Sequence, residues 1–533
     1  MFHHTLVHAR YCMWNYLDLN TNYYQGNLQS LNSKMVEGNK TSTEMHTFLP
    51  QDDALASKYK VQVVSKDVEV ATPLANSKNF DPFTERKIDN PTTDGETLTH
   101  LLKAALGTGI LSMPYAFRGA GIVGGILGTI FVSLICTHCS YILVKCAHVL
   151  YYKTHKTKMG FADVAETAFA TGPKWGRKFS KFSRYFVQIC LFSTYFGACT
   201  AYNIIIATNF GQVIKYYMNH TAPVVLMTNT TTLVNVSDVV NTTTAAIETV
   251  IPLDISFMRI IIACLFVPLI LLVYVPDLKY LAPFSMVANI FMACSLGMTF
   301  YYLVQDMLPI NQLSLVRPYY EFPQFFSVTV FAMEAIGVIM PLENNMKTPQ
   351  NFVGICGVLS RGMGSVTFVY IFLGLLGYMK YGDHANAVIT ANLPIALIPA
   401  QVVKVLIGLA VFFTFGLQFY VCIDIAWNGV KEHFAPRPKV GEYIVRTVMV
   451  ICCVSLAIAI PNIGPLVELV GAFCFSLLGL LAPVVIEVIT YWDVGFGRFN
   501  WMIYKNVVVT VIGLLALVFG TKSAVIGIIE AMM

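Results

Sequence analysis

The sequence is poor in charged residues. Asp, Glu, Lys and Arg make up 12% of its 533 residues, about half the share found in a typical soluble domain. Hydrophobic residues account for 56%, and the mean hydropathy is +0.62. This composition excludes a string of soluble domains and indicates a protein that crosses a membrane several times.

The sequence also lacks a strong excess of either charge. Its formal net charge is +5, and the charged residues are scattered among loops, so we expect no nucleic-acid partner. The first 20 residues contain no apolar stretch of the kind that a secretory signal peptide needs.

Enzyme motifs are absent or out of context. We find no G-x-S-x-G, H-E-x-x-H or P-loop sequence. Residues 119–124 fit G-x-G-x-x-G, but they open an apolar stretch and no βαβ pattern surrounds them, so helix packing explains their glycines better. Cys136 and Cys139 have C-x-x-C spacing without a second pair. We expect neither enzymatic activity nor a metal site.

Apolar stretches recur from Leu98 to the C-terminus and are long enough to cross a bilayer. Residues 20–95, by contrast, are rich in Asn, Ser, Thr, Lys and Asp without periodicity, so residues 1–95 are predicted to be a disordered tail. Residues 96–533 are predicted to form one all-α transmembrane domain. Its roughly eleven predicted spans are 98–118, 121–147, 185–210, 255–275, 280–304, 325–343, 353–379, 395–426, 444–461, 464–490 and 505–530.

The loops differ in basic content, and this difference predicts the orientation of the chain. Lys and Arg are concentrated in the loops after the second and eighth spans, which should therefore be cytoplasmic together with the N-terminal tail. The loop 211–254 lies on the opposite side in this scheme. It contains four Asn-x-Ser/Thr sequons, so we predict a glycosylated external loop. The predicted acceptors are Asn219, Asn229, Asn235 and Asn241.

Two of the predicted spans are interrupted by residues that break helices. The first contains Gly107-Thr108-Gly109 at its middle, and the sixth contains Glu334, Gly337 and Pro341. Interrupted helices at membrane depth are tolerated only where the freed backbone is buried or faces a watery cavity. A pair of them in two halves of a chain indicates the substrate site of a transporter.

Ionisable residues within the spans are costly and few. Glu334 sits mid-span beside the second interruption, and His100 lies one or two turns before the first. Lys404, Glu468 and Glu487 are expected near helix ends, where they can reach water or pair.

Long stretches of the chain resemble one family. They include NPTTDGETLTHLLKAALGTGILSMPYAF at 90–117, PDLKYLAPFSMVANIFM at 276–292, FAMEAIGVIMPLENNMKTPQ at 331–350 and FTFGLQFYV at 413–421. On these residues the chain is similar to insect proton-coupled amino acid transporters of the amino acid/auxin permease group. The resemblance covers the chain from Asn90 onward and leaves out residues 1–89 and the sequon-bearing loop.

The resemblance implies a LeuT-type fold, in which spans one to five and six to ten form inverted repeats and an eleventh is added. In that fold the unwound parts of spans one and six hold the α-carboxylate and α-amino group of the substrate, and the resemblance also implies coupling to protons, with no other cofactor. The residues this implies are Gly107, Thr108, Gly109 and Ile110 around the carboxylate, Glu334, Ala335, Ile336 and Gly337 facing the ammonium, Tyr202 as a substrate-facing tyrosine, and His100 as the proton carrier.

The function we expect is proton-coupled transport of small neutral amino acids by alternating access, in the plasma membrane or in the membrane of late endosomes or lysosomes. The rival is an amino acid sensor that controls growth signalling with little net flux, for which the N-terminal tail offers a surface to cytosolic partners. A channel fits poorly, because no ring of charges or filter-like motif is present. The sequence does not say which amino acids are carried.

Overall fold

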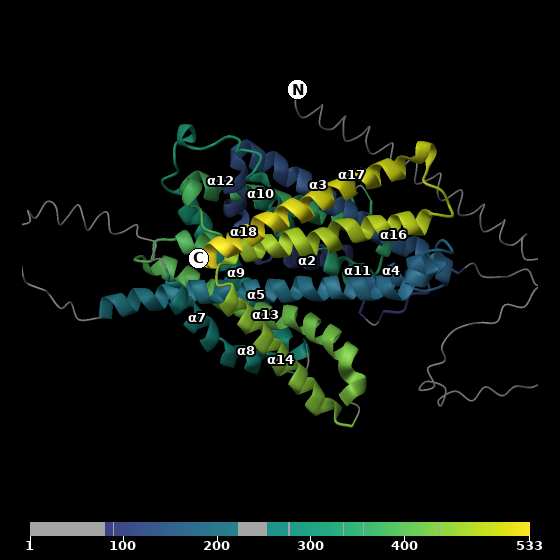
Figure 1. Cartoon of the computed structure of the whole chain (residues 1–533), viewed down its shortest axis with the longest axis horizontal. Coiled ribbons are helices and arrows are strands. Elements are labelled where there is room, and N and C mark those ends of the chain that lie inside the picture. The colour runs from purple at the N-terminus through teal and green to yellow at the C-terminus, as the bar shows by residue number, and fades with distance from the viewer. Residues whose placement is uncertain are drawn as a thin grey trace, which may run out of the picture. The chain divides into compact units, whose positions relative to one another are not determined.

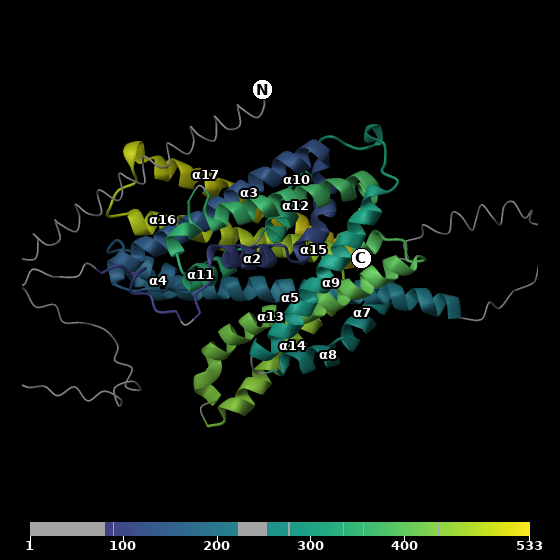
Figure 2. The same cartoon turned by 180° about the vertical axis from the view of Figure 1, so that it is seen from behind.

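The computed structural model consists of helices joined by loops (Figures 1 and 2). It describes residues 80–88, 90–221, 253–275, 278–333, 335–354, 356–434 and 436–532. This part of the chain contains no β-strand, and its one isolated bridge joins Thr92 to Met346. The α-helices are α2 (Asp94–Ala105), α3 (Met113–Thr154), α4 (Phe161–Thr171), α5 (Ser180–Thr221), α7 (Ile255–Cys264), α8 (Phe266–Val273), α9 (Leu278–Val304), α10 (Phe322–Ala332), α11 (Ile336–Asn345), α12 (Val358–Tyr381), α13 (Ile398–Val430), α14 (Pro438–Ala459), α15 (Ile463–Leu469), α16 (Ala482–Tyr491), α17 (Trp501–Leu515) and α18 (Thr521–Met532).

Two boundaries differ from the prediction. The compact unit that holds these helices begins at Pro82, ahead of the predicted boundary at 96, and residues 1–79 of the predicted tail lie outside the described residues. Helix α5 continues to Thr221, so the predicted loop 211–254 begins as helix. The reason is that nothing in GQVIKYYMNHT breaks a helix.

Ten helices of the described residues are long and apolar enough to cross a membrane. The first of them, Thr108–Thr154, bends at Gly121 and so holds the second half of the first predicted span and all of the second. Ten helices therefore accommodate the eleven predicted spans, and the prediction of an all-α polytopic membrane protein is confirmed.

The bend at Gly121 depends on a loop that follows α9. Gly121 has φ 80° and ψ −177°, a conformation that only glycine adopts readily. The N–H groups of Ile122 and Val123, freed by the bend, donate to the carbonyl oxygens of Ser314 and Leu315 at 3.1 and 2.9 Å. The glycine and the loop together let the chain turn without unsatisfied backbone groups.

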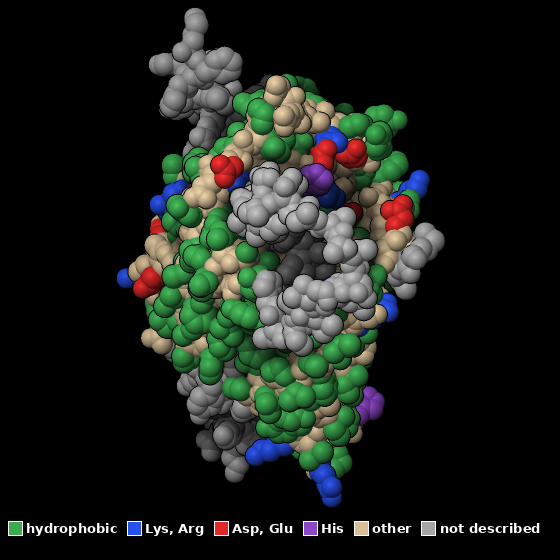
Figure 3. Space-filling model, turned by 90° about the vertical axis from the view of Figure 1, so that its left-hand side faces the viewer, with side chains coloured by type: hydrophobic (Ala, Val, Ile, Leu, Met, Phe, Trp, Pro, Cys, Tyr) green, Lys and Arg blue, Asp and Glu red, His purple; other side chains and the backbone are tan. Residues whose placement is uncertain are grey.

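The outer surface of the helices is apolar. Large side chains such as Leu127, Leu134 and Ile189 are exposed, and Figure 3 shows hydrophobic side chains over most of the described surface on the face it presents. Apolar surface of this extent is expected where a protein meets lipid.

The interior is arranged around the two broken spans. Helix α12 packs on α2 and α3, α13 packs on α5 and α9, and α10 packs on α3 and on the π-helix η11 (Val470–Leu481). The span Phe322–Asn345, which contains α10 and α11, is the most buried of the ten. The second broken span is therefore central, and its neighbours must satisfy whatever backbone groups it leaves free.

Both interruptions lie where the sequence predicted them. Helix α2 ends at Ala105 and the 3₁₀-helix η3 (Thr108–Ser112) resumes the first span after an extended Gly107. Helix α10 ends at Ala332, and α11 begins at Ile336.

One tyrosine serves both interruptions. Tyr370 of α12 is fully buried, and its hydroxyl lies 2.5 Å from the carbonyl oxygen of Ala105 and 2.8 Å from that of Ala332. The hydroxyl donates to one of these oxygens at a time. It thus supplies a hydrogen-bond donor to the last turns of α2 and α10, whose carbonyl groups have no partner within the helix.

Lys404, Glu468 and Glu487 are buried rather than exposed at helix ends. The ammonium of Lys404 donates to Gln212 at 2.7 Å and to the carbonyl oxygen of Thr390. The expectation that such side chains pair is confirmed for Glu487, which lies 2.8 Å from Lys505. Lys404 and Glu468 do not reach water, because neighbouring helices provide polar partners inside the bundle.

Replacing Tyr370 with Phe should destabilise the protein. Two buried carbonyls lose their shared donor, so we expect the free energy of unfolding to fall by about 1–3 kcal/mol. The thermal midpoint of the purified protein in detergent measures this. Tyr378→Phe is the matched control, since Tyr378 is as buried on the same helix and shows no side-chain hydrogen bond to the described residues. Equal midpoints for both variants would show that Tyr370 has no such role.

Candidate functional site

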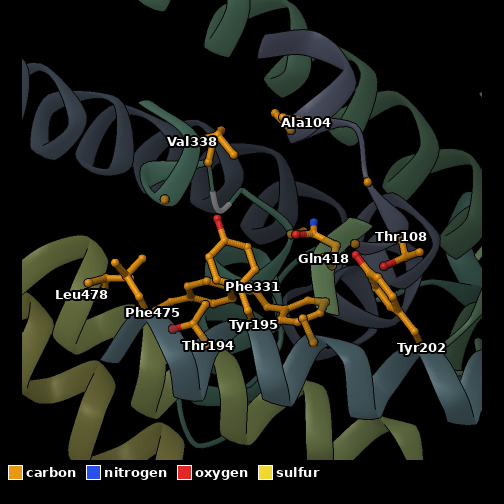
Figure 4. Close-up of a pocket in the computed structure, with 18 residues that line it drawn as sticks. Ala104, Thr108, Thr194, Tyr195, Tyr202, Phe331, Val338, Gln418, Phe475 and Leu478 are labelled. Atoms are coloured by element: carbon orange, nitrogen blue, oxygen red, sulfur yellow. The ribbon is translucent and has the colours of Figure 1, made fainter. Parts of the chain in front are cut away.

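A cavity lies between the two interruptions (Figure 4). The centres of water molecules can occupy about 80 Å³ of it, several times the ~10–15 Å³ that a single water needs. Its walls come from both broken spans and from α5, α13 and η11. The lining residues are Ala104, Ala105, Gly107, Thr108, Gly109, Leu191, Thr194, Tyr195, Ala198, Tyr202, Phe331, Ala332, Ala335, Gly337, Val338, Gln418, Phe475 and Leu478.

Most of the residues predicted to bind substrate line this cavity: Gly107, Thr108, Gly109, Tyr202, Ala335 and Gly337. Ile110 and Ile336 are buried beside them but do not belong to the lining. Glu334 lies outside the described residues. His100 is exposed on α2 and is not part of the lining.

Three side chains form a polar corner of the cavity. The side chains of Tyr202, Thr108 and Gln418 all line the cavity, and the three lie together in Figure 4. Tyr202 comes from α5, Thr108 from η3 and Gln418 from α13, so this corner ties the first interruption to two unbroken spans. Sequence reasoning missed Gln418, although an amide within the apolar stretch FTFGLQFYV was a signal for it.

The opposite wall is mainly apolar. Phe331 and Phe475 meet with ring centroids 5.8 Å apart, and Leu478 continues this wall along η11. A π-helix widens the spacing of side chains along the backbone and often occurs at functional sites. Among the eighteen described lining residues none is charged. The wall therefore suits an uncharged side chain.

Helix ends of both polarities face the cavity. The C-terminal ends of α2 and α10, which carry carbonyl groups, and the N-terminal ends of η3 and α11, which carry N–H groups, lie at the cavity. The N–H groups of Thr108 and Gly109 have no backbone acceptor in the described part of the chain. An N-terminal helix end favours an anion and a C-terminal end favours a cation. This arrangement can hold a small zwitterion.

Two glycines set how closely the walls approach. A Cβ on Gly109 would lie 2.6 Å from the Cα of Ala332, and one on Gly337 would lie 2.4 Å from the hydroxyl oxygen of Tyr195. The two interruptions therefore touch through backbone at Gly109. In Figure 4 the hydroxyl of Tyr195 points to the second interruption.

The buried carboxylate of Glu343, on α11, binds side chains of α3 and of the segment before α2. Glu343 accepts from Arg86 at 3.1 Å and from Tyr151 at 3.0 Å, and Nε2 of His148 lies 3.1 Å from it. Phe83 packs on His148 with ring centroids 5.0 Å apart. We call Arg86, His148, Tyr151 and Glu343 the Glu343 cluster; it fixes residues 83–86 against α3 and α11.

The start of α2 is held to the segment after α11 as well. Thr348 and Asn351 donate to the carboxylate of Asp94 at 2.7 and 2.9 Å. The hydrogen bond from Thr348 is the main reason that the pKa of Asp94 is lowered from its ordinary value. The two broken spans are thus also joined at the ends that lie away from the interruptions.

Gly109→Ala should abolish transport by any mechanism that uses this cavity. The added methyl group meets backbone of α10, which cannot move aside as a side chain does, so the two interruptions must separate. Uptake of labelled amino acid by purified protein in proteoliposomes tests this. The size-exclusion elution profile checks folding. Gly364→Ala is the control, because a Cβ there has nothing within 4 Å. Normal uptake by Gly109→Ala would place the site elsewhere.

Comparison with known proteins shows the family of the chain. The profile of the family described as "Transmembrane amino acid transporter protein" matches residues 90–526. The chain is 52% identical over 488 residues to the "Proton-coupled amino acid transporter-like protein pathetic" of Drosophila melanogaster, covering 92% of this chain and 95% of that protein. It is 28% identical over 435 residues to "Amino acid transporter AVT3C" of Arabidopsis thaliana, covering 80% and 89%. The predicted resemblance is confirmed, and the chain belongs to the transmembrane amino acid transporter family.

Proposed function

We propose that the chain carries small neutral amino acids together with protons, by alternating access. The observation that carries this proposal is the cavity between the two helix interruptions, which combines helix ends of both polarities with an uncharged wall. The helix ends suit the two charged groups that every amino acid shares. The wall of Phe331, Phe475 and Leu478 suits a side chain without charge.

In this proposal the first interruption binds the carboxylate through Gly107, Thr108, Gly109 and Ile110. The second receives the ammonium at Glu334, Ala335, Ile336 and Gly337, with carbonyl groups at the end of α10 and the carboxylate of Glu334 as its partners. Tyr202 faces the substrate beside Thr108. The resemblance alone makes His100 a candidate proton carrier. The name of the Drosophila relative supports proton coupling in this chain.

The inverted repeat of spans one to five and six to ten is part of the same proposal. It is supported by the matched positions of the interruptions and by the way α11 packs on α2 while α10 packs on η3. Each half-span thus has a counterpart from the other repeat beside it, as an inverted repeat requires.

Uptake of labelled alanine, glycine or proline into proteoliposomes tests the function. We expect uptake to rise when the outside is made acidic and to fall when the gradient is collapsed, whereas labelled lysine and glutamate should not accumulate. Protein-free liposomes are the control. Unchanged uptake after collapse of the gradient would remove proton coupling. Saturable binding without flux or exchange would favour the sensor.

The proposed orientation puts the N-terminal tail in the cytosol and 211–254 outside the cytosol, in the plasma membrane or the late endosomal or lysosomal membrane. Asn219 is exposed near the end of α5, whereas Asn229, Asn235 and Asn241 lie outside the described residues. Peptide-N-glycosidase should increase the mobility of the protein from cells on a gel. Replacing all four Asn residues with Gln should remove that change; a change that persists would contradict the orientation.

A further inference from the structure

Glu468 occupies an unusual position among the buried acids. It lies on α15 with 5% of its surface exposed. Tyr115 of α3 donates to its Oε1 at 2.8 Å, and Ser523 of α18 donates to its Oε2 at 3.5 Å. Both donors are neutral hydroxyl groups.

The two other buried carboxyl groups of the described residues are ion-paired. Glu343 has Arg86 at 3.1 Å, and Glu487 has Lys505 at 2.8 Å. No Lys or Arg of the described residues lies within ion-pair distance of Glu468. An ionised carboxylate is costly to bury unless a cation accompanies it. Of the three, Glu468 is therefore the one that can become neutral without leaving a cation behind.

The charged groups near Glu468 do not pair with its carboxylate. From α3, Arg118 stacks on the ring of Tyr115 at 4.5 Å but donates to the carbonyl oxygens of Asp383 and Ala385. Lys522 of α18 is exposed. Helix α10 and η11 contain no charged residue, and the Lys and Arg residues of α5 lie near its two ends. Among the described residues, Arg118 is thus the cation beside Tyr115, and its Nη1 donates to two backbone carbonyl oxygens.

Glu468 also links elements that border the cavity. Tyr115 follows η3 by one turn and precedes the bend at Gly121, so it belongs to the short segment that continues the first interruption. After Leu469 the chain of α15 continues into η11, which places Phe475 and Leu478 in the cavity wall. A movement of that short segment away from α15 would remove the donor of Glu468 and admit water to it.

We propose that Glu468 is the residue that carries the transported proton. The carboxylate takes a proton from the aqueous space on one side, becomes a carboxylic acid while the cavity is occluded, and returns the proton to the other side when Tyr115 moves. No other bond forms or breaks. This inference rests on the proposed proton coupling and assigns it to a group different from His100.

The test uses Glu468→Gln, which imitates the neutral acid and cannot release a proton. In proteoliposomes this variant should lose uptake driven by a pH gradient and should keep exchange between internal and external amino acid. Exchange without dependence on external pH is the expected signature. Gradient-driven accumulation with the wild-type pH profile would overturn the proposal.

A second variant keeps the carboxyl group and guards against misfolding of the first. Tyr115→Phe removes a hydrogen bond that favours the ionised form, so the midpoint of the pH profile should move upward by ~1–2 pH units. An unmoved midpoint in a folded protein would contradict the role of Glu468, whatever the behaviour of Glu468→Gln.

Two comparisons separate this inference from others. Glu487→Gln changes a buried, ion-paired acid one helix further along, and it should leave the midpoint of the pH profile in place even if the yield falls. His100→Ala should also leave the midpoint unchanged. If only His100→Ala shifted the midpoint of the pH profile, the proton carrier would be His100 rather than Glu468. If wild-type uptake does not depend on the pH gradient, the proposal of proton coupling is wrong, whatever the role of Glu468.

Discussion

Two helices that stop and resume within a bilayer leave backbone groups without helical partners, and the rest of the structure follows from satisfying them. The carbonyl ends of α2 and α10 converge on the hydroxyl of Tyr370. The contact of Gly109 with Ala332 brings the interruptions so close that one side chain can serve both. Burial without such partners would cost several kcal/mol for each group.

The same constraint makes the cavity chemically useful. The N–H groups of Thr108 and Gly109 have no backbone acceptor among the described residues and lie beside the cavity. In the proposed mode of binding, the carboxylate and the ammonium of the substrate take the place of the partners that the broken helices lack. Binding of the substrate would then also stabilise the interruptions.

Charged residues inside the bundle fall into two kinds. The Glu343 cluster and the pair of Glu487 with Lys505 are balanced by cations, and they join segments firmly. Lys404 and Glu468 have only neutral partners among the described residues. Balanced groups resist a change of protonation, whereas unbalanced ones favour it. Among the buried carboxyl groups, the proposed movement of a proton therefore fits Glu468 better than Glu343 or Glu487.

The membrane spans, the two interruptions and the family could be predicted from the sequence alone. These are local properties, since a long apolar run and the glycines at 107 and 109 act on the chain around them. Three other features could not be predicted from the sequence: Gln418 lies beside Tyr202 at the cavity, Tyr370 caps both interruptions, and Glu468 lacks, among the described residues, the cation that Glu487 has. These facts depend on the rotation of each helix against its neighbours. Side chains that are alike in hydropathy and depth then meet different partners, and only the packed bundle distinguishes them.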